Sequence, residues 1–233
     1  MKTLVMMPTY NEISGLANAV AALFKHNPDV HLLIIDDNSP DGTGQLADDL
    51  AKDQRVHVLH REAKQGLGKA YLAGYNWGLE HGYDRLVQMD ADGSHRPEDL
   101  PKLLATEADL VIGSRWIAGG AVANWPKHRE VISRGGNLYA RLATGLNFGD
   151  LTAGFRVYKS QALARINLED IQAQGYGFQV EMTLRAAKSG LQIIEVPILF
   201  IERAQGASKM TKGIVLEAFW LCTKWGVARL TKR

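Results

Sequence analysis

The sequence predicts an α/β fold in which a mostly parallel central sheet is flanked by helices. Short apolar runs alternate with helical patterns from the first residues onward, as in parallel sheets whose strands are joined by crossover helices. Polar residues follow the apolar runs at the strand ends beyond which such sheets bind ligands. The 233 residues, 46% of them hydrophobic, are enough to bury one large core.

Five apolar runs in the first half of the chain are predicted to be buried strands. They are Thr3–Met7, Leu32–Ile35, Val56–Leu59, Leu86–Met89 and Leu110–Ile112. Helical patterns separate them, over Leu16–Phe24, Gln45–Lys52, Lys69–Glu80 and Glu98–Leu104. Two consecutive strands with the helix between them form a crossover unit, which predicts parallel pairing.

The alternation ends after Arg115. Trp116–Pro126 is uncharged and contains glycine, and it is predicted to be a functional loop. Further elements are predicted as helices over Ser133–Leu146, Gln179–Lys188 and Gly213–Arg229, and as strands over Phe155–Tyr158 and Gln192–Ile201, the last with Pro197 near a sheet edge. Ala204–Ser208 is predicted to be a loop of small residues. We expect one domain over residues 1–212 and a C-terminal amphipathic helix over residues 213–233.

The composition excludes disordered, collagen-like and disulfide-stapled proteins, because it is that of an ordinary globular chain with a single cysteine, Cys222. The longest stretch without a charged residue, Ile13–Phe24, has 12 residues, fewer than the roughly 20 that cross a bilayer. No secretory signal is recognisable at the N-terminus. We therefore expect a cytoplasmic protein that can still lie on a membrane surface.

The net charge of +2 hides a division of the chain. Residues 1–117 contain 11 Lys and Arg and 17 Asp and Glu, a net charge of −6, whereas residues 118–233 contain 16 and 8, a net charge of +8. An acidic first half and a basic second half indicate two kinds of binding site in one chain.

Acidic residues follow two of the predicted strands. Asp90-Ala91-Asp92 comes directly after Leu86–Met89, and Asp36-Asp37 follows Leu32–Ile35. Carboxylates at a strand end can hold Mg²⁺ or Mn²⁺ between the protein and substrate phosphates. The alternative is an ordinary acidic turn, but four carboxylates at one sheet edge would repel one another without a cation or donor among them.

Two further segments of the first half lie where a nucleotide could bind. Pro8-Thr9-Tyr10-Asn11-Glu12 follows the first strand; Tyr10 could stack on a ring and Glu12 could accept hydrogen bonds, whereas the alternative is helix capping by Asn11 or Ser14. Gly66-Leu67-Gly68-Lys69 lacks the spacing of a phosphate-binding loop, so it is predicted to be the start of a helix.

Arginines, whose planar forks match phosphate groups, gather in the second half. Arg115 ends the fifth strand, and Arg129, Ser133 and Arg134 follow near the start of the next helix; they are candidates for phosphate binding, with a solvated surface as the alternative. A solvated surface is the preferred interpretation for Arg141, Arg165 and Arg185. Arg203 and Lys209 frame the loop Ala204–Ser208. His95 lies near the aspartate pair without an assigned role.

The last helix has an unusual composition. Ile214, Ala218, Leu221, Cys222 and Trp225 share one face, while Lys212, Glu217, Lys224, Leu216 and Trp220 project from the other. Two tryptophans followed by Arg229, Lys232 and Arg233 are typical of a helix in an anionic lipid interface. Packing on the domain core is the alternative, and Cys222 is predicted to be a packed thiol.

The motifs of the whole chain together resemble those of the family 2 glycosyltransferases with a GT-A fold, and within them the polyprenyl-phosphate mannose synthases. The residues that carry the resemblance are 7–12 (MPTYNE), 35–43 (IDDNSPDGT), 89–95 (MDADGSH), 113–115 (GSR), 124–126 (NWP), 133–135 (SRG), 151–156 (LTAGFR), 177–182 (GFQVEM) and 203–209 (RAQGASK). The Asp-x-Asp pair alone is a weak signal, whereas the ordered set is specific.

The resemblance implies transfer of mannose, with inversion, from GDP-mannose to a polyprenyl phosphate at the cytoplasmic membrane face. By position it implies these roles: guanosine binding by Pro8, Tyr10, Glu12, Ile35 and Asp37; ribose, diphosphate and metal binding by Asp90, Ala91 and Asp92; closure over the donor by Arg203 and Lys209; and acceptor-phosphate binding by Arg115, Arg129, Ser133 and Arg134. Asp92, Arg115 and Arg129 would be the catalytic residues. Some relatives have a metal-binding glutamine where this chain has Ser94, a weaker ligand.

Alternatives remain open from the sequence. A UDP-glucose:polyprenyl-phosphate glucosyltransferase would keep the fold and change the donor. A non-catalytic subunit that binds sugar nucleotide or anionic lipid is a candidate from another class. The expected partners are GDP-mannose, a polyprenyl phosphate, a membrane surface and a Mg²⁺ or Mn²⁺ ion; a separate membrane-anchoring protein is an open alternative, and no nucleic acid is expected.

Overall fold

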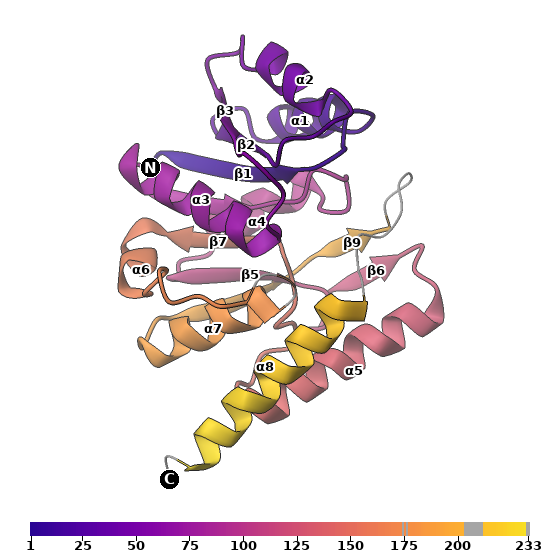
Figure 1. Ribbon diagram of the computed structural model, residues 1–233, viewed down its shortest axis with the longest axis vertical. Coiled ribbons are helices and arrows are strands. Elements are labelled where there is room, and N and C mark those ends of the chain that lie inside the picture. Colours follow the sequence, from indigo (N-terminus) through magenta and orange to yellow (C-terminus); the bar gives the residue numbers. More distant parts are fainter. Residues whose placement is uncertain (174, 176, 203–211, 232–233) are drawn as a thin grey trace.

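The computed structural model describes residues 1–173, 175, 177–202 and 212–231, and a seven-stranded sheet lies at its centre (Figure 1). The strands are β1 (Thr3–Thr9), β2 (His31–Asp36), β3 (Val56–His60), β4 (Arg85–Gln88), β5 (Leu110–Ser114), β7 (Arg156–Lys159) and β8 (Ile193–Pro197), in the order β3-β2-β1-β4-β7-β5-β8. The helices are α1 (Leu16–His26), α2 (Thr43–Leu50), α3 (Leu67–Glu80), α4 (Leu100–Ala105), α5 (Lys127–Thr144), α6 (Ser160–Arg165), α7 (Gly177–Lys188) and α8 (Lys212–Thr231).

Helices cover both faces of the sheet because neighbouring strand residues point to opposite faces. Leu4 and Met6 of β1 pack in a cluster with residues of α3, α6 and α7, whereas Val5 and Met7 pack in a second cluster with residues of α1, α2 and α4. All four side chains are fully buried. The apolar runs that predicted strands are thus the middle layer of a three-layer α/β domain.

The strand β7 is antiparallel to both of its neighbours, β4 and β5, while all the other pairings within this sheet are parallel. This confirms the predicted mostly parallel sheet. Because β7 runs the opposite way, its first residue lies at the edge where β4 and β5 end. The segment that precedes Arg156 therefore reaches the same edge as the acidic residues after β4.

The last helix, α8, packs along α5 on one side of the domain (Figure 1). The rings of Tyr139 and Phe219 stack at 4.1 Å, and Gly226 lies against Ala143, whose carbonyl oxygen would be 3.3 Å from a Cβ at that position. Leu221 and Cys222 are buried, which confirms the packed thiol. Among the described residues no helix is long and apolar enough to span a membrane.

The predicted elements of the first half are confirmed to within a few residues, although Pro97–Asp99 is a 3₁₀ turn ahead of α4. The helix predicted from Ser133 begins earlier, at Lys127, and α6 was not predicted. Two predictions in the second half are wrong. Trp116–Pro126 contains the strand β6 (Ala121–Ala123), and Gln192–Ile201 is two strands, β8 and β9 (Leu199–Ile201).

The break within Gln192–Ile201 has a physical cause. β8 pairs with β5 at the edge of the main sheet, whereas β9 pairs with β6 in a separate two-stranded sheet. Pro197, the last residue of β8, cannot donate a main-chain hydrogen bond, and the chain changes sheets directly after it. Its predicted position near a sheet edge is confirmed.

Candidate active site

The carboxyl ends of β1, β2, β4 and β5 and the start of β7 meet at one edge of the sheet, because the first four strands are parallel and β7 is antiparallel. This edge carries the loop after β1, the acidic residues after β2 and β4, and Arg115 after β5. The topology therefore brings together predicted site residues that are far apart in the sequence.

The loops that follow β1 and β2 are tied to each other by hydrogen bonds. The main-chain N–H of Asn11 donates to Ser39 Oγ at 3.1 Å, and that of Glu12 donates to Thr43 Oγ1 at 3.0 Å. Asn11 has a φ of 57°, the left-handed conformation that asparagine tolerates. The Lys64 Nζ atom lies 4.2 Å from the centre of the Tyr10 ring. These bonds fix the part of the edge to which nucleoside binding was assigned.

Asp36 and Asp37 have different partners. The Asp36 carboxylate accepts hydrogen bonds from Thr9 Oγ1 at 3.1 Å and from Ser39 Oγ at 2.6 Å, so it holds the two loops together. Asp37 pairs with Arg61. Burial raises the pKa of Asp37 above its usual value, although the charge of Arg61 opposes this shift.

The other two residues assigned to the nucleoside lie side by side in the sheet. Pro8 of β1 is in register with Ile35 of β2. The Ile35 side chain is fully buried in the core, so its main chain alone could reach a ligand.

The orientation of Asp90 is set by two buried aromatic residues. The Asp90 N–H donates to His95 Nδ1 at 3.0 Å, and Tyr71 Oη donates to Asp90 Oδ1 at 3.2 Å. His95 Nδ1 carries no proton, because it accepts the hydrogen bond from the Asp90 N–H. The 3.8 Å contact between His95 Nδ1 and Asp90 Oδ2 is therefore not an ion pair. Burial, and then the charge of Asp90, raises the pKa of the Tyr71 hydroxyl well above its usual value. His95, which had no assigned role, thus positions the acidic segment.

The residues after β4 fit a divalent cation that is shared with a bound diphosphate. Asp92 Oδ1 accepts the N–H of Ser94 at 3.0 Å, and the Ser94 hydroxyl is buried without a hydrogen-bond partner among the described residues. Ala91 between the two aspartates is buried. No group of three or more His, Cys, Asp or Glu side chains in the described part of the chain could hold a metal ion, but Mg²⁺ typically needs one or two carboxylates when phosphates supply the other ligands.

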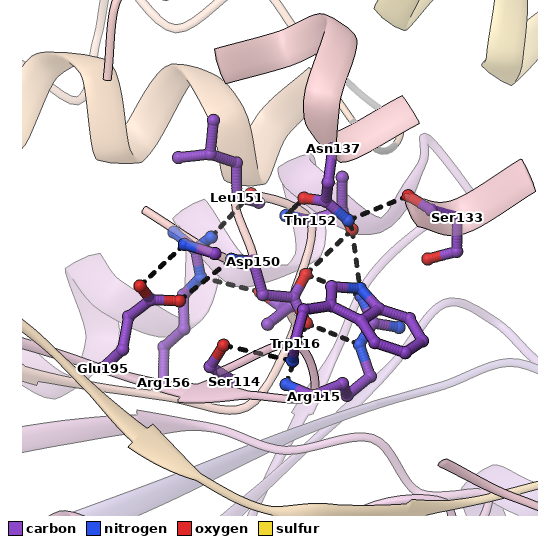
Figure 2. A network of polar contacts seen from close by, with 12 residues as sticks. Ser114, Arg115, Trp116, Ser133, Asn137, Asp150, Leu151, Thr152, Arg156 and Glu195 are labelled. Atoms are coloured by element: carbon purple, nitrogen blue, oxygen red, sulfur yellow. Dashed lines mark hydrogen bonds and ion pairs between the residues drawn. The ribbon is translucent and has the colours of Figure 1, made fainter. Parts of the chain in front are cut away.

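Arg115 forms a buried, bidentate ion pair with Asp150 (Figure 2). Arg115 Nε donates to Asp150 Oδ2 at 2.6 Å and Nη2 donates to Oδ1 at 2.8 Å, while Asp150 is fully buried. Burial alone would raise the pKa of Asp150, but the Arg115 charge and hydrogen bonds outweigh it and bring this pKa below its usual value. The guanidinium group predicted to bind phosphate is therefore held in place by a carboxylate.

The segment from Gly149 to Ala153 is fixed from three sides (Figure 2). Glu195 accepts the N–H groups of Gly149 and Asp150, at 2.7 and 2.9 Å. Thr152 Oγ1 accepts from Arg115 Nη2 at 2.9 Å and from Asn137 Nδ2 of α5 at 3.0 Å. The fully buried Arg156 donates to the carbonyl oxygens of Leu151 and Ala153, at 2.9 and 2.7 Å. This network gives Arg115 a single orientation and connects it to α5.

The other predicted phosphate-binding residues are on α5, and each of the two arginines among them lies over a tryptophan ring. Arg129 lies over Trp125 at 4.3 Å and pairs with Glu202. Arg134 lies over Trp116 at 4.3 Å, and its Nε donates to Glu130 at 2.8 Å. The Arg115 guanidinium is 5.4 Å from the Trp116 ring and 5.6 Å from the Trp125 ring. Each of the two tryptophan rings thus lies close to two guanidinium groups and interacts favourably with both.

The structure places most of the predicted site residues at this edge, but Arg203 and Lys209 lie outside the described residues. The sequence reasoning missed Asp150, Asn137 and Glu195, because no local periodicity marks a partner that is tens of residues away. Thr152 and Arg156 were visible as members of the motif 151–156 (LTAGFR), although their hydrogen bonds were not predictable from it.

The observed fold agrees with the predicted GT-A class: a mostly parallel sheet carries an acidic pair after β4 at its carboxyl edge. Residues 4–166 match the family model described as glycosyl transferase family 2. The chain belongs to that family.

Two curated relatives match over nearly the full chain. An undecaprenyl-phosphate mannosyltransferase from Micrococcus luteus is 54% identical over 231 residues, which cover 98% of this chain and 95% of the relative. A polyprenol monophosphomannose synthase from Mycolicibacterium smegmatis is 49% identical, with 97% of this chain and 87% of the relative covered.

Solved structures share the fold at low sequence identity. A mannosyltransferase from Pyrobaculum calidifontis in complex with GDP-Man and Mn²⁺ has a TM-score of 0.59 and 17% identity, with 99% of this chain and 74% of that chain covered. The glucosyl-3-phosphoglycerate synthase of Mycobacterium tuberculosis with UDP has a TM-score of 0.67 and 17% identity, with 97% and 80% covered. These likenesses confirm the predicted GT-A fold.

Proposed function

We propose that the protein transfers mannose from GDP-mannose to a polyprenyl monophosphate. This proposal rests on one observation. The Asp90–Asp92 segment and Arg115, each held in place by hydrogen bonds, lie at the same edge of the sheet. The names of the two curated relatives, which are about half identical over nearly the whole chain, support mannose as the sugar and a polyprenyl phosphate as the acceptor.

The chemistry needs positioning more than proton transfer. A phosphate monoester has its second pKa near 6, so at neutral pH an acceptor phosphate oxygen can attack without a general base. The new bond joins this oxygen to the anomeric carbon of mannose as the bond from that carbon to the GDP diphosphate breaks, with inversion. A divalent cation held by Asp90 and Asp92, with Ser94 as a possible third ligand, would neutralise charge on the diphosphate.

The two sides of the site would share this work. Tyr10, Glu12 and Asp37 would bind the guanosine, Asp90 and Asp92 the ribose and diphosphate, and Arg203 and Lys209 would close over the donor. On the acceptor side, Arg129 and Ser133 of α5 would bind the phosphate together with Arg115, whose orientation Asp150 fixes. A guanidinium group that is already oriented next to the attacking phosphate lowers the activation barrier of the transfer, because the protein does not have to rearrange during the reaction.

A transfer assay tests the proposed function. The purified protein, incubated with GDP-mannose, Mn²⁺ or Mg²⁺ and a polyprenyl phosphate, should form a mannosyl lipid, and removal of the metal with EDTA should stop the reaction. Calorimetry should show that GDP binds and UDP does not. Transfer from UDP-glucose instead would favour the glucosyltransferase alternative, and nucleotide binding without any product would favour the non-catalytic subunit.

We further propose that α8 and the outer side of α5 lie in the membrane interface. The exposed large apolar residues of these helices are Val131, Ile132, Leu138, Leu142, Leu216, Phe219, Trp220, Val227 and Leu230. A lipid acceptor requires access to a bilayer surface, and the basic second half of the chain favours one with anionic lipids. Whether a separate membrane protein is also needed would be decided by binding to vesicles of lipid alone.

Vesicle flotation tests this placement. The Trp220 side chain is 61% exposed, and losing an indole that inserts into the interface costs roughly 1.5 kcal/mol. We therefore expect Trp220→Ala to weaken binding to phosphatidylcholine–phosphatidylglycerol vesicles by about tenfold. Leu67→Ala, at an exposed apolar residue of α3, is the matched control and should bind as the unmodified protein does. Equal vesicle binding by Trp220→Ala and Leu67→Ala would contradict the proposal that α8 lies in the membrane interface.

A further inference from the structure

A hollow of about 190 Å³ lies beside the site, where α5 faces the segments after β5 and before β7. It is lined by Trp116, Arg134, Asn137, Leu138, Arg141 and Gly149. Arg134 and Arg141 are seven residues apart on α5, which places them two turns from each other, about 10 Å along the helix axis. Both arginines therefore border one hollow from the same helix.

The polar side chains that line the hollow in the described part of the chain are two arginines, Asn137 and the Trp116 indole, with no carboxylate among them. Arg141 Nη2 donates to Asn147 Oδ1 at 2.7 Å, and Arg134 uses Nε for Glu130; the remaining guanidinium N–H groups of both have no hydrogen-bond partner among the described residues. The Trp116 indole N–H is buried, and it too has no such partner in the described part of the chain. This chemistry fits a phosphate group.

The hollow opens at the border of the proposed membrane face. Leu138, one of its lining residues, is 54% exposed, and Leu142 on the next turn of α5 is 67% exposed. When an amphipathic helix inserts its apolar side chains to the depth of the headgroups and upper acyl chains, the charged residues beside them lie at the level of the lipid phosphates. The hollow would then face the phosphate layer of the bilayer.

We propose that this hollow binds the phosphate of an anionic phospholipid next to the acceptor, through Arg134 and Arg141. The inference rests on the proposed membrane placement and gives Arg134 a ligand other than the acceptor phosphate assigned to Arg115 and Arg129. The different surroundings of Arg129 and Arg134 support assigning them to different phosphates. Arg129 lies over the Trp125 ring and pairs with Glu202, whereas Arg134 lies over the Trp116 ring and lines the same hollow as Arg141. Arg141, for which the sequence indicated only a solvated surface, becomes a lipid-binding residue.

The test uses Arg141→Lys in the full chain, because lysine keeps the positive charge but loses the planar fork. Binding of soluble dihexanoyl-phosphatidylglycerol and of farnesyl phosphate is measured by calorimetry, with no transfer required. We expect Arg141→Lys to weaken binding of the phosphatidylglycerol by about tenfold, the loss of one charge-assisted hydrogen bond, and that of farnesyl phosphate by much less. Arg165→Lys, at an exposed arginine bonded to the Ser189 carbonyl oxygen, is the matched control and should change neither.

The other outcomes would overturn the proposal. Unchanged phosphatidylglycerol binding by both Arg141→Lys and Arg141→Gln would show that Arg141 does not contact the lipid phosphate. A larger loss for farnesyl phosphate than for the phosphatidylglycerol would assign the hollow to the acceptor. Because these measurements do not depend on product formation, failure of the lipid site and failure of the mannosyltransferase function are distinguishable.

Discussion

Replacing Asp92 by asparagine should abolish mannosyl transfer and leave the fold intact. Asp92 is half-buried, and its Oδ1 accepts the N–H of Ser94, a bond that an asparagine oxygen can also accept. What the variant loses is the negative charge that would hold a divalent cation against the donor diphosphate. Removing one preorganised electrostatic contact from an active site typically costs about 10²–10³ in kcat, and loss of a metal ligand should cost at least the upper end of that range.

Three measurements on Asp92→Asn separate a metal defect from a folding defect. The rate of mannosyl-lipid formation should fall by about 10³ or more, the melting temperature should stay within a few degrees, and the increase in GDP affinity on adding Mn²⁺ should disappear. Asp48→Asn, at an exposed carboxylate that contacts His60 away from the candidate site, should leave all three unchanged. Full activity of Asp92→Asn would show that the reaction does not require the Asp92 carboxylate.

Replacing Asp150 by asparagine should destabilise the protein strongly. Asp150 is fully buried and pairs with Arg115 through two hydrogen bonds. Removing one partner of such a pair leaves a buried charge uncompensated, which costs about 3–5 kcal/mol. We expect the free energy of unfolding, measured by urea titration, to fall by this amount. Because the Arg115 orientation is lost as well, the KM for the polyprenyl phosphate should rise more than the KM for GDP-mannose.

Two controls test this explanation for Asp150→Asn. Asp49→Asn breaks an exposed ion pair with Lys52 and should cost no more than about 1 kcal/mol. In the double variant Arg115→Gln with Asp150→Asn neither position of the buried pair is charged, so its stability should recover part of the loss. If the double variant is less stable than Asp150→Asn by the full cost of Arg115→Gln alone, the two residues are not coupled.

The same pair predicts a dependence of stability on pH. The pKa of Asp150 is lower in the folded protein than its usual value, which is about 3.9. Its contribution to stability is therefore fully present above about pH 4 and is lost as the pH falls through the folded pKa. The acid side of the stability curve should be less steep in Asp150→Asn. Equal steepness in both proteins would exclude Asp150 as a source of acid sensitivity.

The first half of the fold was predictable from the sequence because most of its strands, unlike the edge strand β3, are mainly apolar and buried along their length. Thr3–Met7 and Leu32–Ile35 are two such runs, and both are in the centre of the sheet. The second half was less predictable because its short strands are only partly buried. Ala121–Ala123 is only three residues long and is exposed or partly buried. The change of sheet after Pro197 depends on pairing with β6, which no local pattern encodes.

The candidate site was predictable where its residues follow strands, as Asp90, Asp92 and Arg115 do. Its supporting contacts were not, because they join residues that are distant in the sequence. Asp150 is 35 positions from Arg115, and Glu195 is 45 positions from Asp150. Asn137 resembles any polar residue of a helix until the structure places Thr152 beside it.

The position of β7 also constrains the order in which the chain can fold during synthesis. β1 to β4 can pair as soon as they are made, but β4 then has an unpaired edge until residues 156–159 emerge. β5, made earlier than β7, has no partner in this sheet before β7 arrives, since its neighbours are β7 and β8. An open edge of this kind favours association with other chains. A nascent chain shorter than about 160 residues should therefore depend on chaperones more than the complete protein does.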